Sequence, residues 1–123
     1  MTLRNFIYPQ GSALSWHDDD NDRVGAYSFC CHKSWNARWG GELLLAESKR
    51  EPTNSIGDTA IDHLSNSEES ALLMEDGFGT FILPKPNRLV VFKSGIMYMI
   101  KRIDSNAGEA LRMVNTGFFL KKI

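Results

Sequence analysis

The sequence contains little of what marks membrane-spanning or nucleic-acid-binding proteins. Its longest apolar runs, 43–46 and 89–92, fall far short of the roughly 20 residues that a membrane-spanning helix needs. Charge of one sign is not in excess, because 14 basic side chains stand against 15 acidic ones and leave a net charge of −1. These absences argue against a membrane protein and against strong binding to nucleic acid or to an anionic membrane surface.

Cysteine is scarce as well. The two cysteines, Cys30 and Cys31, are neighbours in the sequence, so they cannot bridge distant loops. The first residues, Met1 to Asn5, lack the apolar run of a signal peptide. Both observations predict a reducing, cytoplasmic location. The 123 residues predict a single domain, 1–123, because a chain of this size buries about two-thirds of its unfolded surface.

What the chain does have is a series of short segments with the composition of β-strands, separated by Gly and Pro turns. Seven or eight strands are expected within 6–8, 13–17, 24–31, 42–45, 79–83, 89–92, 96–103 and 110–120. The uninterrupted apolar run from Leu89 to Phe92 predicts a strand buried on both faces. With so little helix, the pattern predicts an all-β fold, either a sandwich or a barrel.

A polar segment at 47–77 interrupts this pattern. It contains one helix signature, in which Ser65 and Glu68 form a capping box before the apolar residues 71–74. Gly77 is placed to end that helix. We therefore predict an inserted loop that contains one short helix.

The residues that follow the second expected strand are the strongest candidates for chemistry. If that strand continues through His17, alternation places His17 and Asp19 on one face and Asp18 on the other. An imidazole and a carboxylate on one face can bind the same metal ion, but non-haem Fe(II) is usually held by two histidines and one carboxylate. From these residues alone, a solvated acidic turn after the strand is the favoured interpretation.

Five short motifs occur in the order found in one enzyme family. They are Tyr8 to Asp19, Tyr27 to Cys31, Trp39-Gly40-Gly41-Glu42-Leu43, Pro86 to Phe92, and Arg112 with Thr116-Gly117-Phe118-Phe119. In these motifs the chain resembles the Fe(II)- and 2-oxoglutarate-dependent oxygenases, and within them the prolyl-4-hydroxylase-like group. The resemblance implies a double-stranded β-helix, or jelly-roll barrel, and covers nearly the whole chain except the insertion.

The resemblance also implies roles for individual residues. It makes His17 and Asp19 the first two iron ligands, and Arg112 the cation that binds the distal carboxylate of 2-oxoglutarate. A planar guanidinium suits that role because it offers two parallel donors to a carboxylate. Tyr27 would donate a hydrogen bond to the same carboxylate, or else belong to the core. Val114 stands where the family often has Ser or Thr, so a hydroxyl partner must come from elsewhere.

The third iron ligand departs from the family. The position of the distal histidine falls on Tyr98, and no histidine follows His63 in the chain. Three arrangements are open: Tyr98 binds the metal as a phenolate, water fills the position, or His63 reaches in from the insertion. An unperturbed phenol has a pKa near 10, so a metal would have to drive its deprotonation.

Three functions follow from these residues. The first is an oxygenase that hydroxylates a C–H bond of a peptide, an amino acid or a small metabolite. The second is a degenerate oxygenase domain that serves as an interaction or regulatory module with a lost or weakened iron site. The third, a cupin-like binder or isomerase, leaves Arg112 and the Gly40-Gly41 turn unexplained.

Two further expectations rest on analogy with the family. The 47–77 insertion is placed to act as a lid. The family normally has helices and strands before the metal motif, whereas here His17 comes almost at once. We therefore expect an exposed sheet face or edge, covered by a second copy of the chain or by a missing N-terminal partner segment.

Overall fold

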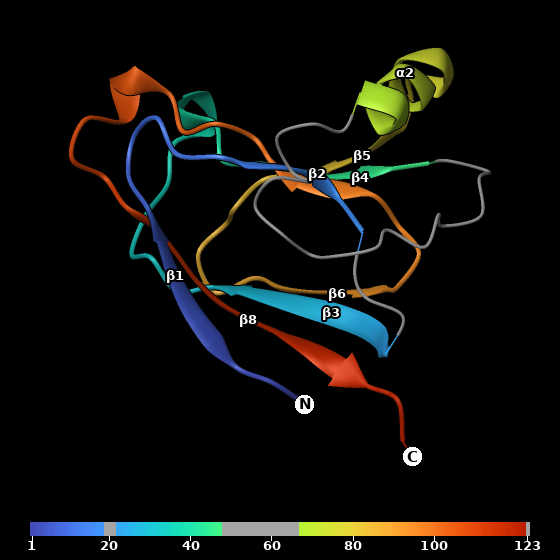
Figure 1. Ribbon diagram of the computed structural model, residues 1–123. Coiled ribbons are helices and arrows are strands. Elements are labelled where there is room, and N and C mark those ends of the chain that lie inside the picture. Colours follow the sequence, from blue (N-terminus) through green and yellow to red (C-terminus); the bar gives the residue numbers. More distant parts are fainter. Residues whose placement is uncertain (19–21, 48–66, 123) are drawn as a thin grey trace.

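A computed structural model describes residues 1–18, 22–47 and 67–122, and these form β-strands, one α-helix and two 3₁₀ turns (Figure 1). The elements in chain order are β1 (Arg4–Tyr8), β2 (Leu14–His17), β3 (Arg23–Cys30), η1 (Ala37–Trp39), β4 (Leu43–Ala46), α2 (Ser67–Asp76), β5 (Gly79–Ile82), β6 (Leu89–Lys93), β7 (Tyr98–Ile100), η2 (Ser105–Ala107) and β8 (Arg112–Leu120). Each expected strand segment overlaps one observed strand.

The strands form two four-stranded antiparallel sheets that face each other in Figure 1. The larger sheet has the order β1-β8-β3-β6, and the smaller sheet has the order β2-β7-β4-β5. The chain changes sheets at every connection between consecutive strands except the one from β4 to β5. Eight strands wound in this way make a jelly roll, so the predicted all-β jelly-roll fold is confirmed.

The core lies between the two sheets. Leu43, Tyr98 and Ile100 of the smaller sheet are buried and pack against Val90 and Phe92 of the larger sheet. The inward positions of β3 are buried as well, whereas its outward positions are partly exposed. Alternation along each strand therefore separates an inner face, which lines the core, from an outer face.

The prediction that Leu89 to Phe92 is buried on both faces is wrong. Val90 and Phe92 point inward, but Leu89 is 59% exposed and Val91 is 60% exposed. The reason is that β6 is an edge strand, and none of the described helices or strands packs extensively on the outer face of the larger sheet. An exposed sheet face is therefore present. Its covering by a second copy or by another segment stays a prediction.

The helix of the polar insertion is present as α2, which lies beside the smaller sheet in Figure 1. Gly77 ends it as expected: its φ is +68°, and its amide donates to the carbonyl of Leu73 over 2.8 Å. Ser65 of the capping box and residues 48–66 of the expected lid lie outside the described residues. None of the described helices is long and apolar enough to cross a membrane.

Candidate functional site

A cavity of about 270 Å³ lies between the two sheets. Both sheets contribute inward-facing side chains to its wall. The larger sheet contributes Arg4, Phe6, Tyr8, Arg23, Ala26, Ser28, Phe92, Arg112, Val114, Thr116 and Phe118, and the smaller sheet contributes Leu14, His17, Leu43, Tyr98 and Ile100. The cavity thus brings Arg112, His17 and Tyr98, three of the residues selected from the sequence, to one space.

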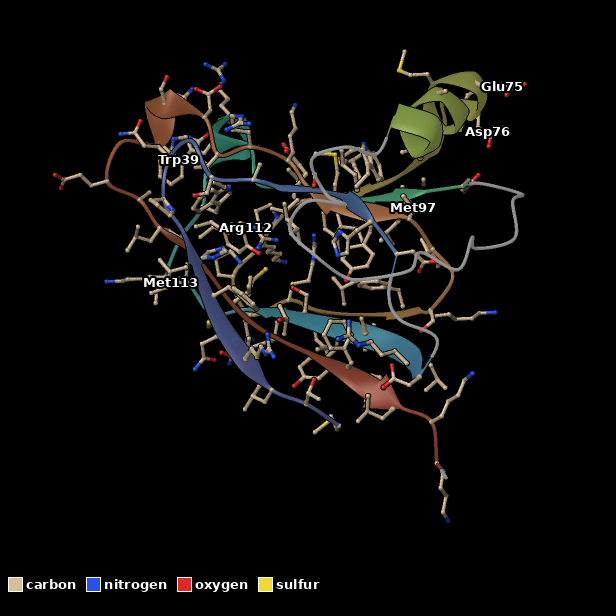
Figure 2. All side chains as sticks on the ribbon, in the orientation of Figure 1. Trp39, Glu75, Asp76, Met97, Arg112 and Met113 are labelled. Atoms are coloured by element: carbon tan, nitrogen blue, oxygen red, sulfur yellow. The ribbon has the colours of Figure 1, made fainter. Side chains whose placement is uncertain are left out.

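Arg112 is the most buried charged group described. Its side chain is 1% exposed and lies between the two sheets in Figure 2. Its Nε donates to the carbonyl oxygen of Gly41 over 2.8 Å, but its buried Nη1 has no hydrogen-bond partner among the residues that the structure describes. A buried donor without a partner costs about 1–3 kcal/mol, and more when it is charged, so this guanidinium is suited to receive an anion.

Burial lowers the pKa of Arg112 below its ordinary value, because desolvation disfavours the charged form. The nearby Cys30, Tyr8 and Glu42 oppose that shift through their negative forms. Arg112 nevertheless remains a cation at neutral pH, because the ordinary pKa of a guanidinium lies far above 7. The end of the cavity at Arg112 is therefore positive and largely dry.

The Gly40-Gly41 turn forms the seat of Arg112. Both glycines have positive φ, +77° and +76°, which is costly for other residues. A Cβ on Gly41 would lie 2.8 Å from Cδ1 of Ile103 and 3.0 Å from Cδ of Arg112. Nε1 of Trp35 donates to the carbonyl oxygen of Gly40 over 3.0 Å and holds the turn in place. The turn motif is thus explained as the support that orients the arginine.

Tyr8 is a neighbour of Arg112 that sequence analysis gave no role. It stands opposite Arg112 in the β1–β8 register, and the guanidinium carbon lies 5.4 Å from the centre of its ring. Burial raises the pKa of Tyr8, and the positive charge of Arg112 opposes that rise. In the sequence, Tyr8 is marked only by its place at the start of the first motif. Its position beside Arg112 depends on the pairing of β1 with β8, which come from opposite ends of the chain.

Cys30 completes the surroundings of Arg112. It is 4% exposed, on the inner face of β3, where it pairs with Val114. Burial raises the pKa of its thiol above the ordinary value of 9.0, and the charge of Arg112 partly opposes that rise. The thiol is therefore protonated at neutral pH and does not neutralise the arginine.

Tyr27 borders the cavity, but its hydroxyl group does not lie at Arg112. It pairs with Gly117, an outward position of β8, and its ring lies 5.6 Å from that of Phe119. Its hydroxyl donates to the carbonyl oxygen of Thr2 over 2.8 Å. For Tyr27 to donate to a carboxylate at Arg112, as predicted, its hydroxyl group would have to give up the hydrogen bond to Thr2. Tyr8, by contrast, already lies beside Arg112.

His17 and Tyr98 form the other end of the site. They are cross-strand partners in β2 and β7, and their ring centres are 4.1 Å apart. Nδ1 of His17 lies 2.8 Å from the carbonyl oxygen of Ser15. Because a carbonyl only accepts, Nδ1 carries the hydrogen of this bond. A hydrogen bond of this kind on the second nitrogen is typical of metal-binding histidines.

The acidic turn after His17 is described only in part. The carboxylate of Asp18 accepts from the amide of Gly95 over 3.2 Å, so Asp18 fastens the turn after β6. Asp19, the predicted second iron ligand, and His63 lie outside the described residues. In the described ranges, His, Cys, Asp and Glu side chains do not gather in groups of three that suit a metal. The iron site therefore stays a prediction.

His32 is the other histidine that the structure describes, and its contacts are structural. It is 4% exposed. Its Nε2 lies 2.6 Å from the carbonyl oxygen of Pro84, and its Nδ1 accepts from the amide of Met113 over 3.2 Å. With both nitrogens in hydrogen bonds to backbone, His32 joins β8 to the loop after β5.

Comparison with known proteins supports the fold. Neither protein-family models nor curated proteins match this chain. Among solved structures, the chain is similar to the crystal structure of a Pseudomonas putida prolyl-4-hydroxylase, with a TM-score of 0.64 and 19% sequence identity. The match covers 98% of this chain and 51% of that one, so this chain spans about half the length of the hydroxylase. The likeness shows that the two proteins share a jelly-roll fold.

Proposed function

We propose that this chain is a non-haem oxygenase that uses Fe(II) and 2-oxoglutarate to hydroxylate a C–H bond of a peptide, an amino acid or a small metabolite. The observation that carries the proposal is the buried guanidinium of Arg112. Its Nη1 has no hydrogen-bond partner among the described residues, and it lines the same cavity as His17. The structural likeness to a prolyl-4-hydroxylase supports the same assignment.

The Arg112 end of the cavity fits 2-oxoglutarate. A guanidinium forms two parallel, charge-assisted hydrogen bonds to a carboxylate, which fixes both its position and its orientation. The cavity volume of about 270 Å³ lies near the lower end for ligand pockets, about 300 Å³, and suits a small dicarboxylate. Ser28 and Thr116, which pair across β3 and β8, line the same cavity and supply hydroxyl groups where Val114 supplies none.

The His17 end fits iron through the chemistry of its donors. Nε2 of His17 and the carboxylate of Asp19 would bind the Fe(II) ion. The third position would be filled by Tyr98 as a phenolate, by water, or by His63. Bound Fe(II) and 2-oxoglutarate would supply the activation of dioxygen, with oxidation of the cosubstrate to succinate and CO₂. The chain supplies orientation: Arg112 fixes the far carboxylate, and the apolar wall at Leu43, Ile100 and Val114 excludes water.

One observation favours a second candidate, a degenerate oxygenase domain with a binding role. Tyr98 is 7% exposed, and its ring packs edge-on against Phe92 with centres 4.8 Å apart. It therefore belongs to the apolar core as much as to the metal position. A chain of this kind would keep the anion site at Arg112 and bind iron weakly.

An anaerobic titration of the chain with Fe(II) and 2-oxoglutarate separates the two candidates. An oxygenase gives the weak visible metal-to-ligand charge-transfer band and forms succinate after oxygen is admitted. A protein that binds 2-oxoglutarate by calorimetry but shows neither band nor succinate is the degenerate domain. No binding of 2-oxoglutarate at all would contradict both.

The variant Tyr98→His tests the third iron position. We expect it to increase Fe(II) affinity about tenfold, or ~1.4 kcal/mol, because imidazole is a better ligand for Fe(II) than a protonated phenol. Tyr98→Phe is the matched control, since it keeps the ring and removes the hydroxyl. Equal Fe(II) affinities for the His and Phe variants would mean that position 98 does not face the metal.

A further inference from the structure

His32 lies outside the cavity, yet both of its ring nitrogens are fixed. Its side chain is 4% exposed, and it is not among the described residues that line the cavity. Nδ1 accepts from the amide of Met113 over 3.2 Å, and Nε2 lies 2.6 Å from the carbonyl oxygen of Pro84. Because an amide only donates and a carbonyl only accepts, Nδ1 holds a lone pair and Nε2 carries the hydrogen. His32 is therefore a neutral bridge with one orientation.

The bond to Met113 takes the place of a backbone bond at the end of the β3–β8 ladder. The amide of Cys31 donates to the carbonyl oxygen of Met113 over 2.9 Å, but the amide of Met113 donates to the side chain of His32. The strand β3 has already ended, at Cys30. Met113 directly follows Arg112, the first residue of β8. The imidazole of His32 thus fixes the backbone of β8 next to the arginine.

A second connection runs from His32 to the other end of the arginine side chain. The ring centre of Trp35 lies 5.1 Å from that of His32, and Nε1 of Trp35 donates to the carbonyl oxygen of Gly40 over 3.0 Å. The carbonyl oxygen of Gly41 accepts from Nε of Arg112 over 2.8 Å. Trp35 also borders this turn directly, because a Cβ on Gly41 would lie 3.3 Å from its Cζ2. The contact between imidazole and indole therefore supports the turn that holds the guanidinium.

We propose that His32 is a positioning residue for Arg112, which acts on cosubstrate binding without contacting the ligand. Its bond to Met113 fixes the backbone of the arginine, and its contact with Trp35 supports the turn at the guanidinium. Orientation matters because a guanidinium binds a carboxylate through two parallel hydrogen bonds, and a side chain in such a site must be held within about 0.5 Å. The role of His32 rests on the proposed function, in which Arg112 binds 2-oxoglutarate.

Two amide substitutions separate the two hydrogen bonds of His32. The side-chain oxygen of an asparagine takes the place of Nδ1 and accepts from Met113, whereas the side-chain nitrogen of a glutamine takes the place of Nε2 and donates to Pro84. His32→Asn thus keeps the bond next to Arg112, and His32→Gln loses it. Each variant leaves one backbone group without its partner and removes the ring, so urea unfolding should show both midpoints lowered to a similar extent.

The measurement that a merely structural role would not change is the affinity of the folded chain for 2-oxoglutarate, determined by calorimetry. We expect His32→Gln to bind 2-oxoglutarate about fivefold more weakly than His32→Asn, the factor that corresponds to one hydrogen bond. Equal affinities in the two variants would overturn the connection through β8.

The connection through the turn is tested with His32 intact. Trp35→Phe keeps a ring and removes the N–H that donates to Gly40, so we expect it to weaken 2-oxoglutarate binding about fivefold. Trp39→Phe is the matched control and should leave the affinity within about a factor of two. The ring of Trp39 packs edge-on against Trp35 with centres 5.2 Å apart, but its N–H makes no hydrogen bond to the turn in the described part of the chain.

Equal affinities in the two tryptophan variants would overturn the connection through the turn. If neither His32 variant folds, this pair decides alone: a loss confined to Trp35→Phe supports the positioning of Arg112, and equal affinities overturn it.

Failure of the proposed function gives a different result. If the wild-type chain gives no calorimetric signal with 2-oxoglutarate, the oxygenase assignment is contradicted and the role of His32 with it. If the wild-type chain binds 2-oxoglutarate and the two His32 variants bind it equally well, only the role of His32 is contradicted.

Discussion

The two faces of the larger sheet are built from alternate residues of the same strands, and they differ sharply. On the inner face Cys30, Arg112 and Val114 are 4%, 1% and 1% exposed. On the outer face Ile7, Leu89 and Val91 are 58%, 59% and 60% exposed, although all three are apolar. A buried arginine therefore stands on one side of the sheet and exposed aliphatic side chains on the other.

This contrast indicates which side of the sheet is suited to bind a ligand. Burying a charge is costly, so an arginine held inside by Gly41 points to binding rather than to stability. The exposed aliphatic groups lie on the face whose covering by a second copy of the chain or by another segment stays a prediction. Neighbouring residues on opposite faces therefore provide matched pairs for mutation.

The pair Arg112 and Met113 should give the largest difference. Met113 follows Arg112 in β8 but is 37% exposed, and Figure 2 shows the two side chains apart. We expect Arg112→Gln to reduce 2-oxoglutarate affinity at least about 30-fold, because loss of one partner of a buried charge pair costs about 2–5 kcal/mol. Met113→Gln should leave the affinity within a factor of two. Calorimetric titration measures both, and equal losses would contradict the assignment of Arg112.

The pair Tyr8 and Tyr27 tests which tyrosine serves the cosubstrate. Tyr8→Phe should weaken 2-oxoglutarate binding about fivefold, corresponding to one hydrogen bond of ~1 kcal/mol near Arg112. Tyr27→Phe should leave that binding unchanged and instead lower the free energy of unfolding by ~1 kcal/mol, because the carbonyl of Thr2 loses its partner. Titration and urea unfolding of both variants decide the question. Weaker binding only in Tyr27→Phe would restore the role expected from the sequence.

The pair Cys30 and Cys31 should give the smallest difference, visible only at alkaline pH. Burial raises the pKa of Cys30 in the folded chain above 9.0, so this thiol ionises more readily in the unfolded chain. Its contribution to stability is complete below pH 9 and is lost as the pH rises above that value. Cys30→Ala should therefore flatten the alkaline fall in the free energy of unfolding.

Cys31 is exposed and supplies the control. Cys31→Ala should keep the wild-type dependence of unfolding free energy on pH, measured by urea unfolding between about pH 8 and 10. Tyr8, whose pKa is also raised by burial, remains in both variants and contributes at higher pH. Identical slopes in the two variants would mean that the Cys30 thiol is not shielded from solvent.

The sequence predicted the strands because each is defined by local composition. The segments around Phe6, Leu43 and Phe92 are short, apolar and bounded by turns, and each is a strand in the structure. Gly77 marked the end of α2 for a local reason as well, since its φ is positive. Features that depend on a few neighbouring residues were within reach of sequence analysis.

The site was predicted less completely because it depends on pairing between distant strands. His17 and Tyr98 are cross-strand partners, and their role as metal ligands stays a prediction. The inward positions of Tyr8 and Cys30 follow from the registers of β1 and β3 with β8. Composition does not specify those registers. For the same reason Tyr27 was selected as a cosubstrate-binding residue, although it pairs with Gly117, an outward position of β8.

The central claim is that one cavity binds 2-oxoglutarate between Arg112 and a metal at His17. A crystal structure of the chain with 2-oxoglutarate and Mn(II), which replaces Fe(II) without reacting, tests it directly. The account predicts one carboxylate of the ligand at Nη1 of Arg112 and the metal at Nε2 of His17. A water molecule at Nη1, with 2-oxoglutarate elsewhere or absent, would contradict it.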